Sequence, residues 1–336
     1  MIRLAINGFG RIGRNSLKVS MQKKGIEVVA VNDLTDTKTL AHLLKYDTSY
    51  GRWNAKVGYD ANHIIVGKKK IRVLSEREPI KLPWKKLKVD VVLECTGIFR
   101  TEELARPHLA AGAKRVIISA PAKGGNIPTH VMGVNETSYD SKKHAIINNA
   151  SCTTNCIAPV AAVIHGTFGV LKAMMTTIHG YTADQNLQDG PHKDLRRARA
   201  AAMNIVPTDT GAAVATTQTI PELSGLFDGI SMRVPVAVGS IADFTFLLAK
   251  KVTVEQVNNA IKKAAKNPIY KGVLSWTEDP IVSSDIIGSP YSSIVDLSMT
   301  MVVDGNMLKI VSWYDNEWGY SNRLVEMAIH VGKTLR

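Results

Sequence analysis

Short apolar runs and stretches of helical spacing alternate along the first 150 residues. Apolar runs at residues 2–6, 26–31, 89–94, 116–119 and 144–148 are typical of buried parallel strands. Stretches at residues 11–24, 37–44 and 101–111 have the spacing of amphipathic helices. A shorter pair of runs at 64–66 and 71–74 predicts a hairpin around the lysines at 68–70. The pattern predicts an α/β domain with a doubly wound, Rossmann-type parallel sheet.

The second half of the chain has a different pattern. A helix-like run at 157–164 is followed by strands at 171–177, 230–234, 241–248 and 307–312 that alternate as in an antiparallel sheet. Thr253 and Gln256 form a capping-box signature that begins a helix running to about residue 266. We therefore expect an α+β catalytic domain with a mostly antiparallel sheet at 152–317. The first domain is expected at 1–151, joined by a C-terminal helix at 318–336.

A glycine pattern follows the first predicted strand. Gly8, Gly10 and Gly13 form Gly-x-Gly-x-x-Gly at the start of a helical stretch. These glycines permit a tight turn, close approach of a pyrophosphate to the backbone and close packing of helix on strand. Asp33 ends the second strand twenty residues after Gly13, where a ribose-hydroxyl acceptor is required. The spacing predicts a dinucleotide site.

Cys152 lies where an apolar run ends in small polar residues and a helix begins. The partial positive charge of a helix N-terminus favours a thiolate, so the position predicts a lowered pKa and a nucleophilic thiol. Ser151, Thr153 and Thr154 add hydroxyl donors around it. The alternative is a buried cysteine beside an ordinary N-cap.

Composition narrows the class of protein. The chain has 336 residues, 45% hydrophobic and 21% charged, which suits two globular domains, and its net charge of +13 suits anionic ligands. Its three cysteines are Cys95, Cys152 and Cys156, and their spacing indicates neither a disulfide framework nor a zinc site. The apolar runs fall short of the ~20 residues that span a bilayer, so we expect a soluble cytoplasmic protein without a metal.

Seven motifs, in order along the chain, carry a family resemblance. They are Asn-Gly-Phe-Gly-Arg-Ile-Gly-Arg at 7–14, Ala-Ser-Cys-Thr-Thr-Asn-Cys at 150–156, His-Gly-Tyr-Thr at 179–182, Asp-Leu-Arg-Arg-Ala-Arg at 194–199, Thr-Gly-Ala-Ala at 210–213, Met-Arg-Val-Pro at 232–235 and Trp-Tyr-Asp-Asn-Glu-Trp-Gly-Tyr at 313–320. Together they resemble the phosphorylating glyceraldehyde-3-phosphate dehydrogenases over essentially the whole chain.

The resemblance implies a mechanism. Cys152 corresponds to the nucleophile that adds to the aldehyde of D-glyceraldehyde 3-phosphate, and His179 to the base that activates the thiol. The Cys152 backbone N–H and the His179 side chain would hold the oxyanion. NAD takes the hydride, and inorganic phosphate cleaves the thioester to give 1,3-bisphosphoglycerate, in glycolysis or gluconeogenesis.

The resemblance also implies binding residues and a homotetramer. The substrate phosphate would lie at Thr182, Arg196 and Arg233, and inorganic phosphate at Ser151, Thr153, Thr210 and Gly211. Arg197 and Arg199 are the neighbours that could instead only make surface ion pairs. The cofactor residues would be Gly8, Gly10, Arg11, Ile12, Gly13, Asp33, Arg77, Ser119 and Asn316, with Tyr320 beside the nicotinamide ring. We expect subunits to meet at the loop of residues 183–200.

Cofactor preference follows from Asp33. Its carboxylate can accept hydrogen bonds from both ribose hydroxyls and would repel a 2′-phosphate, and Leu34 offers no cation, so NAD is preferred over NADP. Two departures from the family pattern stand out. Gly190 occupies a place where many members have leucine, and residues 236–240 differ without an evident meaning. Cys156, one helical turn after Cys152, is interpreted as a packed small residue.

Two other functions remain open on the sequence alone. An erythrose-4-phosphate dehydrogenase would share the cysteine and histidine but hydrolyse its acyl-enzyme. A nucleic-acid-binding protein could use the basic surface, although no helix-turn-helix, zinc-finger or RNA-recognition motif is present, so such binding would be secondary.

Overall fold

The computed structural model describes residues 1–124 and 126–335. The chain divides into two compact units. The first contains Met1–His130, Glu136–Ala150 and Ser321–Arg336, and the second contains Val131–Asn135 and Ser151–Tyr320. The domain boundaries expected from the sequence stay a prediction, and they differ from these units chiefly at Val131–Asn135.

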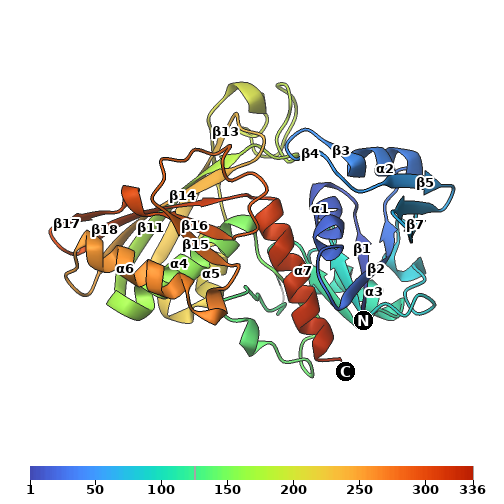
Figure 1. Cartoon of the computed structure of the whole chain (residues 1–336), viewed down its shortest axis with the longest axis horizontal. Coiled ribbons are helices and arrows are strands. Elements are labelled where there is room, and N and C mark those ends of the chain that lie inside the picture. Colours follow the sequence, from blue (N-terminus) through green and yellow to red (C-terminus); the bar gives the residue numbers. More distant parts are fainter. Residues whose placement is uncertain (125, 336) are drawn as a thin grey trace. The chain divides into compact units, whose positions relative to one another are not determined.

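The first unit is built on an eight-stranded sheet (Figure 1). Six strands are parallel, and two antiparallel strands, β6 and β5, extend one edge. The strand order is β10 (Ile146–Asn148), β9 (Arg115–Ile118), β8 (Val91–Glu94), β1 (Ile2–Asn7), β2 (Ile26–Asn32), β7 (Lys69–Leu74), β6 (His63–Val66), β5 (Val57–Asp60). The order runs outward from β1 in both directions, which opens a crevice at the carboxyl ends of β1 and β8. The predicted Rossmann-type sheet is confirmed.

Helices α1 (Arg11–Ser20), α2 (Thr37–Lys45), α3 (Glu102–Ala110) and most of α7 (Trp318–Lys333) belong to this unit, with a small ribbon of β3 (Tyr46–Asp47) and β4 (Gly51–Arg52). Helix α1 is shorter than the predicted 11–24, because the chain turns after Ser20 and Gly25 takes a positive φ of 83°. In α7, Gly332 lies against Ile2 of β1, where an added Cβ would meet the isoleucine side chain at 2.7 Å.

The second unit is built on a mostly antiparallel sheet, as predicted. Its order is β12 (Val206–Asp209), β13 (Phe227–Val234), β11 (Val170–Gly180), β14 (Ser240–Leu248), β18 (Met307–Tyr314), β16 (Ser293–Asp296), β15 (Leu274–Thr277), with β17 (Met301–Val303) paired to β18. Only the pairs β11–β13 and β15–β16 are parallel.

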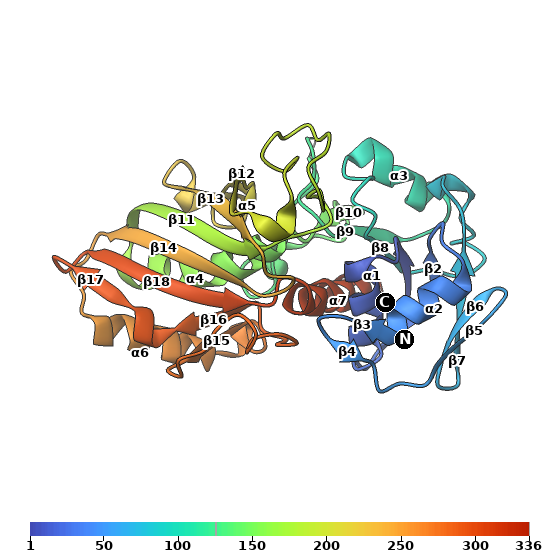
Figure 2. The same ribbon diagram turned by 90° about the horizontal axis from the view of Figure 1, so that it is seen from above.

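Three helices gather on one face of this sheet (Figures 1 and 2). They are α4 (Cys152–Phe168), α5 (Ala212–Thr219) and α6 (Val254–Ala265). Phe244 and Phe246 of β14 are fully buried in the core that α4 and α6 share with the sheet. The capping box predicted for α6 is present, since the Thr253 side chain accepts from Gln256 N and the Gln256 side chain accepts from Thr253 N.

Six short 3₁₀ helices complete the described elements: η1 (Pro79–Lys81), η2 (Glu136–Ser138), η3 (Ala201–Met203), η4 (Pro221–Leu223), η5 (Pro268–Tyr270) and η6 (Leu297–Met299). Within the described residues, no helix has both the length and the apolar character that crossing a membrane requires.

Candidate functional site

Cys152 is the first residue of α4, as the sequence predicts. Ser151 is the N-cap, and its side-chain oxygen accepts from the backbone N–H of Thr154 at 3.0 Å. Ala150 has a positive φ of 54° and is fully buried, and its N–H donates to Asn148 Oδ1 at 3.0 Å. A left-handed alanine costs about 1–3 kcal/mol and persists only where the surroundings impose it. The strained backbone therefore fixes the sharp turn that delivers Cys152 to the start of the helix.

His179 lies near the end of β11 and meets the thiol. Its Nε2 is 3.3 Å from Cys152 Sγ. Its Nδ1 is 2.6 Å from the carbonyl oxygen of Gly180 and 2.7 Å from an Nη1 atom of Arg233. The guanidinium is only a donor and the carbonyl only an acceptor, so the two contacts require different tautomers, and the shorter contact, to the carbonyl, requires the proton on Nδ1. In this tautomer the lone pair on Nε2 faces the thiol. The ring is then placed to accept the proton of Cys152.

Arg233 adds a cation to this pair. It lies on β13, which is parallel to β11, so that Arg233 and His179 are register partners. The buried Nε of Arg233 makes no hydrogen bond within the described part of the chain, and Nη1 also donates to Gly180 O at 3.3 Å. A half-buried guanidinium with an unused donor is a ready site for an anion.

The lowered pKa that the sequence predicted for Cys152 is wrong. Desolvation raises the pKa of the thiol, and it outweighs the charge of Arg233 and the hydrogen bonds from Thr153 that lower it. Desolvation, together with Arg233, lowers the pKa of His179 to about 3. The pair is therefore thiol and neutral imidazole at neutral pH, and a thiolate forms by transfer of the proton to Nε2.

Tyr314 packs against His179 and holds Thr153, the residue that follows Cys152. The Tyr314 hydroxyl is buried 2.9 Å from Thr153 Oγ1 and 2.7 Å from Thr177 Oγ1, and its ring lies edge-on to the His179 ring at 5.9 Å. Burial raises the pKa of Tyr314, so the hydroxyl keeps its proton. Thr153, predicted as a phosphate ligand, thus has its hydroxyl engaged with Tyr314.

Two further predicted phosphate residues lie at another helix start. Gly211 is the N-cap of α5, and the Thr210 hydroxyl accepts from Ala212 N at 3.2 Å. A helix N-terminus with exposed N–H groups favours anions. Thr182 lies two residues after the end of β11, half-buried, with its N–H directed to Gln185 Oε1 at 3.4 Å.

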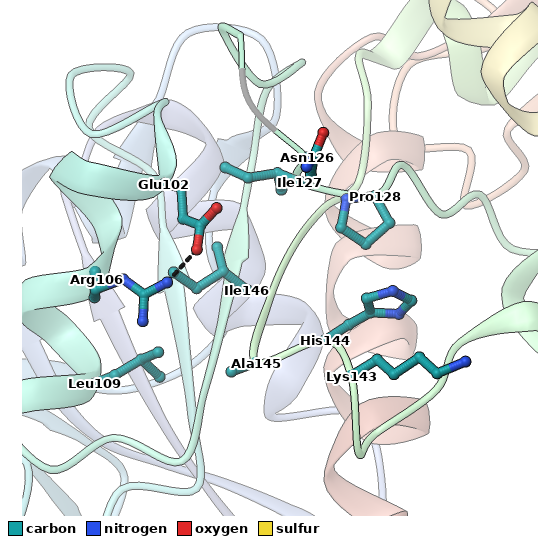
Figure 3. Close-up of a pocket in the computed structure, with 10 residues that line it drawn as sticks. All are labelled: Glu102, Arg106, Leu109, Asn126, Ile127, Pro128, Lys143, His144, Ala145 and Ile146. Atoms are coloured by element: carbon teal, nitrogen blue, oxygen red, sulfur yellow. Dashed lines mark hydrogen bonds and ion pairs between the residues drawn. The ribbon is translucent and has the colours of Figure 1, made fainter.

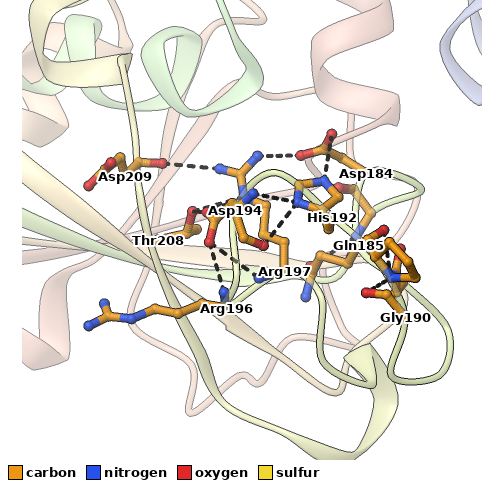
Figure 4. Close-up of polar contacts among 12 residues, drawn as sticks. Asp184, Gln185, Gly190, His192, Asp194, Arg196, Arg197, Thr208 and Asp209 are labelled. Atoms are coloured by element: carbon orange, nitrogen blue, oxygen red, sulfur yellow. Dashed lines mark hydrogen bonds and ion pairs between the residues drawn. The ribbon is translucent and has the colours of Figure 1, made fainter.

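The two adjacent arginines of the 183–200 loop point in different directions (Figure 4). Arg196 is exposed, and its side chain makes no hydrogen bond or ion pair within the described residues. Arg197 is half-buried: it donates from Nε to Thr208 Oγ1 at 2.8 Å and forms ion pairs with Asp184 and Asp194. Burial is the main cause that lowers the pKa of Arg233, and the charge of Arg197 contributes to the same shift, which places the two cations within electrostatic range. Arg199 is exposed and pairs with Asp189 at 2.8 Å, which is the surface ion pair that the sequence left open for it.

In the first unit, the glycine turn has the close contacts that its pattern requires. Gly8 has a φ of 90°, and an added Cβ would lie 2.7 Å from Thr96 N. A Cβ on Gly13 would lie 2.2 Å from the carbonyl oxygen of Gly8. Gly10 is the N-cap of α1. No side chain fits at Gly8 or Gly13, so the backbone is free to approach a pyrophosphate.

A cavity of about 620 Å³ opens beside this turn. Asp33 lies in its wall, and its carboxylate accepts from Phe9 N at 2.8 Å and Thr35 N at 3.0 Å. The lining residues are Asn7, Gly8, Gly10, Asn32, Asp33, Leu34, Glu76, Arg77, Cys95, Thr96, Ile98 and Phe99. The crevice, the acid and the turn fit the adenosine part of a dinucleotide.

Other predicted cofactor residues lie outside this lining. Arg11, at the first position of α1 beside Ile12, is ion-paired with Asp47 at 3.0 Å. Ser119 follows β9, and its side chain bonds to Cys95, whose pKa burial raises to about 12. Tyr320 of α7 is buried.

Asn316 contacts two residues of the segment 236–240, which departs from the family pattern. Its Oδ1 accepts from Gly239 N at 3.0 Å and from Ser240 Oγ at 3.1 Å, which leaves its amide N–H groups as the donors available to a ligand. Gly239 has a φ of 102°, and an added Cβ would lie 2.6 Å from Ser283 O. Glycine is therefore required at this turn. Gly190 is tied into its loop by a bond from its N–H to Ala198 O at 3.0 Å.

A second cavity of the first unit, about 400 Å³, contains no predicted site residue (Figure 3). The Glu102–Arg106 ion pair and His144 lie in its wall. Nowhere in residues 1–124 or 126–335 do histidine, cysteine and carboxylate side chains group as metal ligands. All three cysteines are free, and Cys156 is buried beside Ser293 and Ser312 as the packed residue that was expected.

Oxidation of an aldehyde through a thiol requires a nucleophilic cysteine, a base beside it and a site for a dinucleotide. The second unit contains the cysteine and the base, and the first unit contains the crevice for the dinucleotide. The protein therefore belongs to the class of NAD-dependent dehydrogenases that use a cysteine.

Comparison with known sequences gives the family. The model described as "Glyceraldehyde 3-phosphate dehydrogenase, C-terminal domain" matches residues 151–316, and the corresponding NAD binding domain model matches residues 2–102. The chain is 57% identical over 335 residues to glyceraldehyde-3-phosphate dehydrogenase 2 of Streptomyces avermitilis, covering 99% of both. It is 54% identical over 330 residues to glyceraldehyde-3-phosphate dehydrogenase of Geobacillus stearothermophilus, covering 98% of both. The chain belongs to the glyceraldehyde-3-phosphate dehydrogenase family.

Replacing His179 by asparagine tests the proton acceptor. We expect alkylation of Cys152 by iodoacetamide to slow at least about tenfold at pH 7 and its pH profile to move upward, because a thiol with a raised pKa then has no base. The rate should be followed from pH 5 to 10 in both proteins, since iodoacetamide is neutral and does not respond to Arg233. A profile identical to that of the unmodified protein would rule out this role.

Replacing Asp33 by glycine tests cofactor selection. The unmodified protein should have a much higher kcat/KM with NAD than with NADP, since a 2′-phosphate would meet the Asp33 carboxylate. In the variant, the ratio of kcat/KM for NAD to kcat/KM for NADP should fall, because the repelling carboxylate is gone and Arg77 in the same cavity can bind the 2′-phosphate. Comparable values for the two cofactors before substitution would contradict the argument.

Proposed function

We propose that the chain catalyses the phosphorylating oxidation of D-glyceraldehyde 3-phosphate by NAD through Cys152, in glycolysis or gluconeogenesis and in the cytoplasm. The observation that carries the proposal is the 3.3 Å contact between Cys152 Sγ and His179 Nε2 at the start of α4. A thiol, a neutral base and an adjacent anion site together suit covalent catalysis on a phosphorylated aldehyde.

The first step is addition. The thiol proton moves from Sγ to Nε2, and the sulfur bonds to the aldehyde carbon. The carbonyl oxygen then gains charge near the backbone N–H of Cys152, one of the donors at a helix start that have no partner within the helix. The N–H now on Nε2 is a second donor to that oxygen, which takes this proton as the hemithioacetal forms.

The second step is oxidation. His179, neutral again, accepts the hydroxyl proton of the hemithioacetal while a hydride leaves its carbon, and a thioester to Cys152 remains. When bound, NAD is the hydride acceptor. In the third step, an oxygen of inorganic phosphate attacks the thioester carbon and the sulfur leaves as thiolate, so that 1,3-bisphosphoglycerate is released. The thiolate then takes back the proton that Nε2 accepted in the second step, which restores the thiol and the neutral imidazole.

Two groups of residues would hold the phosphates. Arg233, with its unused Nε, and Thr182 would bind the phosphate of the substrate. Ser151, Thr210 and Gly211, at the starts of α4 and α5, would bind inorganic phosphate, with Thr153 fixing the first helical turn through Tyr314.

We assign Arg197, in place of Arg196, as the second phosphate-binding arginine, and we place it at the inorganic-phosphate site instead of the substrate-phosphate site. Arg197 is held beside Thr208, two residues before Thr210, and its charge acts on Arg233. Arg196 has no such anchor. A bound phosphate would compete with Asp184 and Asp194 for the Arg197 guanidinium.

The second unit also offers surfaces for a homotetramer. On the sheet face opposite the three helices, Met174 is 64% and Ile230 is 44% exposed, and Leu187 and Leu195 of the 183–200 loop are each at least 80% exposed. Exposed apolar side chains of this size favour burial against another copy. Sedimentation equilibrium should give four chain masses, and a monomer at micromolar concentration would exclude the assembly.

The decisive experiment follows NADH absorbance with glyceraldehyde 3-phosphate in the presence and absence of inorganic phosphate. Turnover should require phosphate, because the thioester is cleaved by it. The Cys152→Ser variant should retain NAD binding and lose more than about 95% of turnover, since a serine hydroxyl stays protonated. Phosphate-independent turnover that is faster with erythrose 4-phosphate would favour the hydrolysing alternative.

Replacing Arg197 or Arg196 by alanine shows which of the two arginines binds phosphate. Arg197→Ala should raise the KM for phosphate about tenfold or more, because a bidentate donor is lost. Arg196→Ala is the matched control, with the same charge change one residue away, and should alter KM less than about twofold. The opposite result would return the assignment to Arg196.

A further inference from the structure

A fully buried carboxylate lies directly behind the dinucleotide crevice. Glu94 ends β8, is 1% exposed and accepts four hydrogen bonds: from Asn7 Nδ2 at 2.6 Å, His108 Nε2 at 3.1 Å, Thr96 N at 2.8 Å and the Thr96 hydroxyl. The first two reach Oε2 and the other two reach Oε1. Both oxygens act only as acceptors, which suits the ionised form.

The partner histidine is neutral, as the position of Trp84 shows. Trp84 Nε1 is only a donor, and it lies 3.0 Å from His108 Nδ1, so Nδ1 must be the acceptor. The ring proton is then on Nε2 and points to Glu94. Nε2 also lies 3.4 Å from Asn7 Nδ2, because both groups donate to the same carboxylate oxygen. Within the described residues, all of the side chains bonded to Glu94 are therefore uncharged.

The network continues from Glu94 into the crevice wall. Asn7 donates to Glu94, so its Oδ1 accepts, and it does so from Asn32 Nδ2 at 2.7 Å. Asn32 in turn donates to Glu76 O at 2.8 Å and accepts from Glu76 N at 2.9 Å. Asn7, Asn32, Glu76 and Thr96 all line the 620 Å³ cavity. One buried charge thus fixes the donor and acceptor orientation of wall residues at the ends of β1, β2 and β8 and just beyond β7.

We propose that Glu94 is the positioning residue of the adenosine half of the cofactor site, holding Asn7 and Thr96, and through Asn7 also Asn32 and Glu76, in the arrangement that NAD meets. A buried ion held by neutral donors is stable only while every donor stays in place. Glu94 therefore resists rotation of any of these groups without touching the cofactor. The proposal rests on the proposed function only for the identity of the cofactor.

Glu94→Gln tests the proposal, because glutamine keeps the shape but turns one acceptor into a donor that faces two donors. We expect the Kd for NAD, measured by titration calorimetry on the full chain, to rise about tenfold, and the Kd for ADP-ribose to rise equally. The kcat at saturating NAD and the alkylation rate of Cys152 should change less than about twofold. Asp90→Asn is the matched control, since Asp90 precedes β8 at its other end, and it should leave the Kd unchanged.

A swap of acid and amide provides a rescue. In the double variant Glu94→Gln, Asn7→Asp, the glutamine amide donates to the new carboxylate and its carbonyl accepts from Thr96 N, while His108 can donate to position 7. NAD binding should return to within about threefold of the original. An unchanged Kd in Glu94→Gln, or a folded swap that binds no better than that single variant, would overturn the proposal.

A third variant tests the proposal in case the two Glu94 variants fold poorly. Thr96→Val keeps the shape and the backbone donor, and it removes the hydroxyl bond to Glu94 together with the bond that the hydroxyl accepts from Ile98 N at 3.0 Å. The Kd for NAD should then rise about threefold at an unchanged kcat, and an unchanged Kd would overturn the proposal. Loss of turnover in the unmodified chain with normal NAD binding would instead count against the proposed function alone.

Discussion

The candidate active site in the second unit depends on one contact, between the first residue of α4 and the end of β11. To bring Cys152 Sγ within 3.3 Å of His179 Nε2, the chain must turn sharply before the helix, and a buried alanine takes a left-handed conformation to do so. The Ser151 cap, the Tyr314 hydrogen bonds and the pairing of β11 with β13 all serve to hold the two ends of this contact. Backbone strain is the local cost of that precision.

The same contact shows how burial and charge compete. A helix N-terminus and an arginine both favour a thiolate, yet enclosure by protein raises the pKa of Cys152 and lowers that of His179. Arg233 acts on both groups in the same electrostatic sense, stabilising an anion at sulfur and opposing a cation on the ring. An anion bound at Arg233 would reduce the second effect, which connects occupancy of the phosphate site with transfer of the thiol proton.

Much of the fold follows from local sequence, and the exceptions have physical reasons. The strands of the first sheet were predictable because buried parallel strands are short apolar runs, and the glycine turn because no side chain fits there. Helix α5 was missed because Ala212 to Thr219 is buried on several sides and shows no amphipathic period. Strands β15 to β17 were missed because each is only three or four residues long and lacks the continuous run of buried apolar residues that marks the equally short β8.

The site was predictable where a motif marks it and not where packing makes it. Cys152 and His179 were found from motifs, whereas the direction of their pKa shifts depends on enclosure by residues distant in sequence. Choosing between Arg196 and Arg197 required the direction of two adjacent side chains. Glu94 gave no signal, because in sequence it is only the polar end of a strand, and its partners come from positions 7, 96 and 108.

The glycine turn and Asp33 differ in how strongly the surrounding structure limits substitution. A side chain at position 13 would collide with Gly8 O, so any substitution there would displace the turn. Within the described part of the chain, the Asp33 side chain bonds only to two backbone N–H groups, so its replacement leaves the strands and the glycine turn in place. Cofactor preference can therefore be changed by mutation at the end of β2, while the turn that receives the phosphates keeps its geometry.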